Sequence, residues 1–101
     1  MNNMEVENKL KSVLGEFFKD SFYKEAIKNL RESLINNNYE NWEKVVLIIV
    51  NRELEKGRPL YLIHNTSNLP LDENTDEEAY KWLNLMLINS MGGVDSPVIE
   101  Y

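Results

Sequence analysis

The sequence predicts an all-α protein, a compact bundle of about four helices. Three observations lead to this prediction: apolar residues recur at three- and four-residue steps, a helix-capping sequence begins at Thr75, and asparagine and glycine runs fall where the periodic segments end. With 101 residues, 43% hydrophobic and 28% charged, the chain has the size and composition of a globular domain. We therefore expect one helical domain over residues 1–101, with a short C-terminal tail at 94–101.

The first two helices are predicted from amphipathic stripes. Within residues 3–18 six apolar side chains fall on one helical face: Val6, Leu10, Val13, Leu14, Phe17 and Phe18. A second helix is expected to begin near Asp20 or Ser21, both suitable N-caps, and to end at the asparagines 36–38. Its apolar stripe comprises Phe22, Ala26, Ile27, Leu30 and Leu34.

Residues 39–56 allow two interpretations because the run 45–50 is apolar and rich in β-branched residues. A helix is favoured, since Asn38 can cap it, good helix formers follow the run, and Gly57 can end it. Being apolar all round, this helix would be the central one. In the alternative, residues 44–64 form a β-hairpin and the fold is α+β.

The rest of the sequence predicts a long connection and one further helix. Residues 60–74 are expected to be a loop with a short helical turn or strand at 60–63. Thr75 and Glu78 form a capping box, which starts a helix that runs to Met91 and ends at the glycines 92–93. The tail follows.

The residues that carry common chemistries are sparse. Cysteine is absent, which excludes disulfides and thiolate metal sites, and His64 has no second histidine beside which to act. The glycines form no phosphate-binding loop, and the acidic run 72–78 lacks the spacing of a calcium loop. We therefore expect a protein with no catalytic site, no cofactor and no bound metal.

The net charge is concentrated at the C-terminal end of the sequence. Of the formal charge of -6, residues 1–71 contribute nothing, with ten Lys/Arg against ten Asp/Glu, whereas residues 72–101 carry one lysine against seven carboxylates. Charge of one sign in one region acts on association with partners rather than on the fold. A basic protein partner is therefore expected, while nucleic acid and anionic membranes would be repelled.

The N-terminal residues lack the basic and apolar regions of a signal peptide, and the apolar run 45–50 is too short to span a bilayer. A cytoplasmic protein is expected on these grounds.

The acidic run also has a structural explanation. Asp76, Glu77 and Glu78 complement the positive end of the helix dipole, for about 0.3–1 kcal/mol each. Carboxylates before the cap and beyond the helix end are not explained in this way. The tail residues Val98, Ile99 and Tyr101 suit an interface anchor or, equally, docking onto the protein's own core. The residues predicted to bind a partner are Asp72, Glu73, Asp76, Glu77, Asp95, Ile99, Glu100 and Tyr101.

An acidic, cysteine-free, helical chain of this size, with the capping box Thr75–Glu78 preceded by Asp72 and Glu73, resembles the small immunity proteins of contact-dependent growth inhibition and bacteriocin systems. The resemblance implies a 1:1 complex with the toxin domain of a secreted bacterial effector, commonly a nuclease, which is held inactive in the cytoplasm. Carboxylates can occupy the basic groove with which such a toxin binds RNA. The alternative is a helical adaptor whose apolar patch binds another helix and whose charge serves solubility.

Overall fold

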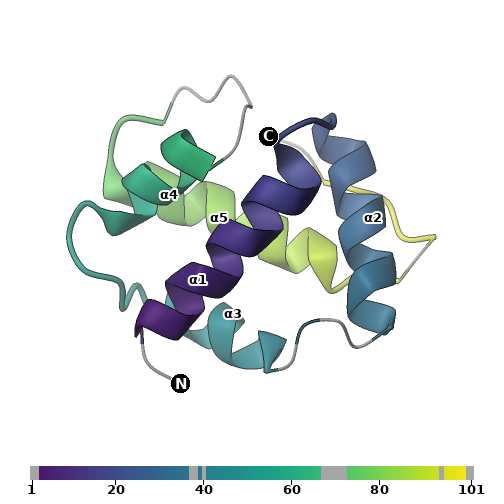
Figure 1. Ribbon diagram of the computed structural model, residues 1–101, viewed down its shortest axis with the longest axis horizontal. Coiled ribbons are helices and arrows are strands. Elements are labelled where there is room, and N and C mark those ends of the chain that lie inside the picture. Colours follow the sequence, from purple (N-terminus) through teal and green to yellow (C-terminus); the bar gives the residue numbers. More distant parts are fainter. Residues whose placement is uncertain (1–2, 37–38, 40, 67–72, 94, 100–101) are drawn as a thin grey trace.

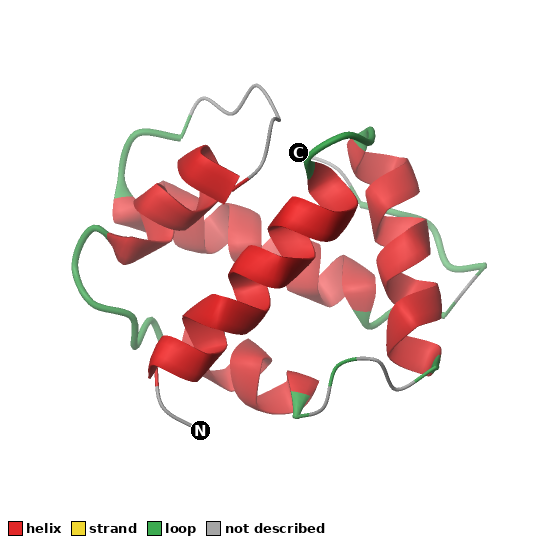
Figure 2. Cartoon of the chain, viewed as in Figure 1, coloured by secondary structure: helices red, strands yellow, loops and turns green. Residues whose placement is uncertain are grey.

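The computed structural model contains five α-helices and one π-helical segment, and every regular element among the described residues is helical (Figure 1, Figure 2). The structure describes residues 3–36, 39, 41–66, 73–93 and 95–99. The elements are α1 (Asn3–Val13), η1 (Leu14–Phe18), α2 (Tyr23–Ile35), α3 (Trp42–Val50), α4 (Arg58–Thr66) and α5 (Asp76–Ser90). The all-α prediction is confirmed, with five α-helices in place of about four.

Helix α5 occupies the centre of the molecule. It packs against α2, α3 and α4, while α1 passes in front of it and packs against α3 and α4 (Figure 1). The radius of gyration of 12.4 Å is close to the value of about 13 Å expected for a compact domain of this length. The expectation that residues 39–56 form the central helix is wrong, because α3 has neighbours on only part of its surface and α5 is buried on several sides.

One buried cluster of side chains joins all five helices. The predicted stripes of the first two helices contribute to it, with the exception of Phe22, which precedes α2 and is 84% exposed. Helix α2 begins at Tyr23 rather than near Asp20, so Phe22 lies outside the helical face on which the stripe was drawn. The ring of Phe18 instead packs at 5.8 Å from both Tyr23 and Trp82. Within the described ranges, no helix is long and apolar enough to cross a membrane.

Helix α3 ends at Val50, seven positions before the predicted stop at Gly57. Its C-terminus is closed by Arg52 in the left-handed conformation, with φ of 53°, which turns the backbone N–H groups of Arg52 and Glu53 back to the carbonyls of Ile49 and Ile48. This hydrogen-bond pattern is the Schellman motif, in which glycine is the usual left-handed residue. Because the left-handed residue here is an arginine, the sequence does not indicate that the helix ends at this point.

Most of helix α4 falls in residues 60–74, the segment predicted as a long connection. Pro59 lies in its first turn, where the missing N–H group costs nothing. The carboxylate of Asp76 accepts hydrogen bonds from the backbone N–H groups of Gly57 (2.7 Å) and Leu60 (3.4 Å). The N-terminus of α4 is therefore capped by a residue 16 positions or more further along the chain, which local sequence cannot indicate.

The predicted start of α5 is confirmed. The Thr75 hydroxyl accepts a hydrogen bond from the backbone N–H of Glu78 and donates one to its carboxylate, both at 3.2 Å. The helix ends at Ser90, with Met91 as C-cap, immediately before the two glycines.

Replacing Thr75 with alanine is expected to lower the free energy of unfolding by about 0.5–2 kcal/mol, the usual cost of a lost N-cap. Urea denaturation followed by far-UV circular dichroism measures the change. Thr75→Ser keeps the hydroxyl and is the matched control. Equal midpoints for the alanine and serine variants would show that this cap does not stabilise α5.

Candidate functional site

The structure separates the predicted partner-binding residues into two groups. Glu73 lies three residues before α5 and Asp76 and Glu77 lie in its first turn, whereas Asp95 and Ile99 follow its last turn. Helix α5, which lies between the two groups, has 15 residues and is therefore about 22 Å long. The other three predicted residues, Asp72, Glu100 and Tyr101, lie outside the described part of the chain.

Two of the three acidic residues in the first turn of α5, Asp76 and Glu77, have partners in other elements. Asp76 caps α4, as described above. Glu77 forms a bidentate ion pair with Arg52, with Nε and Nη2 of the guanidinium at 2.7 and 2.6 Å from the two carboxylate oxygens. These contacts tie the loop after α3 to the first turn of α5. The sequence alone predicts that the same two carboxylates bind a partner protein.

The hydrogen bond from Arg52, supported by its positive charge, lowers the pKa of the Glu77 carboxyl group below the ordinary value of 4.5. A carboxylate with a lowered pKa in the folded state stabilises that state above the unfolded-state pKa, and the contribution is lost as the pH falls through the folded-state pKa. The ion pair is exposed, so its contribution is small.

We expect the difference in unfolding free energy between the wild type and Glu77→Gln to be largest near pH 7 and to shrink steadily toward pH 3. Urea denaturation at successive pH values measures it. Glu55→Gln, at a nearby exposed position with no ion pair among the described residues, is the control. A difference that stays constant over this pH range would contradict the ionic origin.

We call the first turns of α5, the residues 73–75 before it and the adjoining loop 51–57 the acidic end. It holds six carboxylates against three cationic side chains, a net charge of -3: Glu53, Glu55, Glu73, Asp76, Glu77 and Glu78 against Arg52, Lys56 and Lys81. Internal ion pairs do not alter the net charge, and the net charge determines the long-range field. The Glu73 carbonyl accepts a hydrogen bond from His64 Nε2 (2.6 Å), which also gives the single histidine a structural role.

The C-terminal segment is held to the body of the protein by two buried side chains, Arg31 and Asn89. Arg31 donates from Nε to the Asn89 carbonyl and from Nη1 to the Ser96 carbonyl, both at 2.7 Å, with a longer contact from Nη2 to the Pro97 carbonyl. The Asn89 amide exchanges hydrogen bonds with the backbone of Ile99, at 2.7 and 2.9 Å. The tail therefore docks onto its own core, while the side chain of Ile99 remains exposed.

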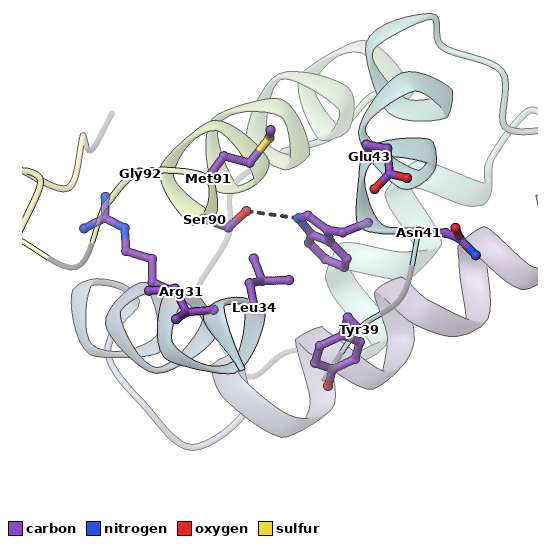
Figure 3. Close-up of a pocket in the computed structure, with 10 residues that line it drawn as sticks. Arg31, Leu34, Tyr39, Asn41, Glu43, Ser90, Met91 and Gly92 are labelled. Atoms are coloured by element: carbon purple, nitrogen blue, oxygen red, sulfur yellow. Dashed lines mark hydrogen bonds between the residues drawn. The ribbon is translucent and has the colours of Figure 1, made fainter. Parts of the chain in front are cut away.

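A groove lies where α2 and α5 end and α3 begins (Figure 3). It has a volume of about 710 Å³ and a mixed apolar and polar lining: Arg31, Leu34, Ile35, Tyr39, Asn41, Trp42, Glu43, Ser90, Met91 and Gly92. In Figure 3, Met91 and Glu43 stand on opposite sides of the groove, and the Arg31 guanidinium turns away toward the C-terminal segment. Among the described residues that line the groove, Glu43 supplies the carboxylate.

Two hydrogen bonds fix the aromatic wall of this groove. The indole N–H of Trp42 donates to the Ser90 hydroxyl at 3.3 Å, and the Tyr39 hydroxyl donates to Glu16 at 2.7 Å. Partial burial raises the pKa of Tyr39, so its hydroxyl stays protonated at neutral pH. No sequence pattern indicates the groove, because it forms only where the end of α5 meets the junction of α2 and α3, and Trp42 and Ser90 are 48 positions apart in the chain.

The chain matches no protein-family model, no curated protein and no solved structure.

Proposed function

We propose that this protein is an immunity-type binding protein that acts in the cytoplasm and holds a basic, RNA-cleaving toxin domain inactive in a 1:1 complex. The single observation that carries the proposal is the acidic end, where a net charge of -3 gathers on one side of a molecule whose total charge is -6. The role is one of binding and involves no catalysis by this chain.

A toxin that cleaves RNA needs a positively charged groove for the phosphates. Carboxylates on a rigid helix end can enter that groove and exclude the substrate. Because Asp76 and Glu77 are engaged within the fold, their main contribution to binding is the field that they add, whereas Glu53, Glu55 and Glu78 project as exposed carboxylates. Such a field accelerates association, and salt screens it within about 8 Å at physiological ionic strength.

The proposal is tested by affinity capture with the wild-type chain from its native host, followed by identification of the bound protein and an RNA-cleavage assay. A basic protein whose cleavage activity is abolished by one equivalent of this chain is the expected result. A captured protein that is acidic, or that cleaves RNA equally well in the complex, would contradict the proposal.

A charge-matched pair of variants tests the acidic end itself. Glu53→Gln with Glu55→Gln is expected to slow association with the captured protein and to flatten its dependence on salt. Glu25→Gln with Glu32→Gln removes the same charge from exposed positions on α2 and serves as the control. If both variants associate at the same rate, the effect comes from total charge and not from this surface.

A second candidate function, the helical adaptor, is favoured by one observation. Helix α3 exposes large apolar side chains, as expected of a surface that binds another helix. For an adaptor, neutralising the acidic end would leave the association rate unchanged.

A further inference from the structure

Helix α3 is apolar on a face that no other described element covers. Its sequence, WEKVVLIIV, is almost entirely hydrophobic, and Trp42, Val45 and Ile49 are buried against the rest of the protein. On the outer face Leu47 and Val50 are 57% and 49% exposed. Apolar residues all round a helix are typical of a helix with neighbours on every side.

A second set of exposed apolar side chains lies at the C-terminal end of α5. Ile88 and Met91 are each 60% exposed and, at a spacing of three residues, share one face. The two helices run in opposite directions, because Trp42 at the start of α3 bonds Ser90 at the end of α5, and Leu54 after α3 bonds Tyr80 in the first part of α5.

These two faces form one surface, which we call the apolar strip: Leu47, Val50, Ile88 and Met91. Glu43 and Met91 line the same groove, and Leu47 follows Glu43 by four residues on the same face of α3. Since the helices are antiparallel, the two rows lead away from the groove in the same direction. At the groove Ile35, which is also exposed, extends the strip onto α2.

The far end of the strip meets the acidic end. Val50 precedes Arg52 by two residues, and Arg52 is bound to Glu77 on α5. The surface therefore has the groove lined by Glu43 at one end, an apolar centre, and a net charge of -3 at the other end.

We infer that the apolar strip is the docking surface for the basic partner. The partner's own apolar patch would lie on α3 and α5, and Lys and Arg side chains beside that patch would lie on the acidic end. The inference rests on the proposed function and names the surface on which it is carried out. Charge complementarity selects this occupant, since a second copy of the chain also carries -6 and would be repelled. The groove, at one end of this surface, would receive a side chain of the partner.

The inference is tested with a photo-cross-linking phenylalanine analogue placed at Leu47 or Ile88 in the full chain, in its native host. Phe22 and Tyr61, which are exposed apolar residues on other elements, are the control positions. The expected result is an adduct from both strip positions, but from neither control, with the same basic protein that the wild-type chain captures. Adducts from the control positions alone would overturn the inference. An adduct with twice the mass of the 11.9 kDa chain would also overturn it, because the occupant would then be a second copy of the chain.

A matched pair of variants measures the contribution to affinity. Leu47→Ser with Ile88→Ser should weaken binding to the captured protein by about tenfold or more, while Phe22→Ser with Tyr61→Ser leaves it unchanged. Far-UV circular dichroism verifies that both variants are folded. Failure to capture any basic protein refutes the proposed function, and this inference with it, whereas capture that is insensitive to the strip variant refutes this inference alone.

Discussion

Replacing Arg31 with methionine is expected to lower the free energy of unfolding by about 2–4 kcal/mol, the range for removing a buried, hydrogen-bonded charged group. The guanidinium is buried, with the residue only 2% exposed, and donates to three backbone carbonyls at the end of α5 and in the C-terminal segment. Methionine retains the apolar stem but leaves those carbonyls without their donor. Urea denaturation measures the change.

The matched control is Arg52→Met, which removes an exposed guanidinium that also makes two short hydrogen bonds. An exposed ion pair contributes little to stability, so the control variant should remain close to the wild type. If the two methionine variants lose equal stability, burial is not what makes Arg31 important.

Gly92 provides a second test of the same contact. A Cβ atom on Gly92 would lie 2.8 Å from Nη2 of Arg31, so Gly92→Ala should destabilise the wild type. In the Arg31→Met background the clash with the guanidinium is gone, and the same substitution should cost less. A double-mutant cycle measures this coupling. Strictly additive effects would show that the two residues do not touch in solution.

The parts of the fold that the sequence predicted are those encoded locally. The stripes of α1 and α2 and the cap of α5 depend on residues within one or two turns of each other. The end of α3 and the start of α4 depend instead on a left-handed arginine and on Asp76, which is distant in the chain. No pattern of neighbouring residues indicates either feature.

The candidate site was predictable as charge but not as geometry. The sequence places the carboxylates at the start of α5, yet it does not show that Arg52 and the N-terminus of α4 engage two of them. Nor does it show which face of the apolar run 45–50 stays exposed, because that depends on how α1 and α5 cover the helix. The partner-binding role of these residues stays a prediction.

Deleting residues 98–101 is expected to destabilise the protein as well as to affect binding. Val98 packs against the core, and the backbone of Ile99 satisfies both polar atoms of the buried Asn89 side-chain amide. Without the tail that amide loses its two bonds to Ile99 and keeps the one to the Tyr23 hydroxyl. Leaving a buried polar group unsatisfied costs about 1–3 kcal/mol, which urea denaturation of the truncated chain measures.

A weaker complex after truncation would therefore not by itself show that the tail contacts a partner. Ile99→Ala separates the two roles, since it removes an exposed side chain but keeps both backbone hydrogen bonds to Asn89. Its unfolding free energy should stay within about 0.5 kcal/mol of the wild type. If Ile99 anchors the partner, this variant dissociates faster from the captured protein at unchanged stability. If dissociation is also unchanged, Ile99 is no anchor, and the described tail contributes through the stability of the fold.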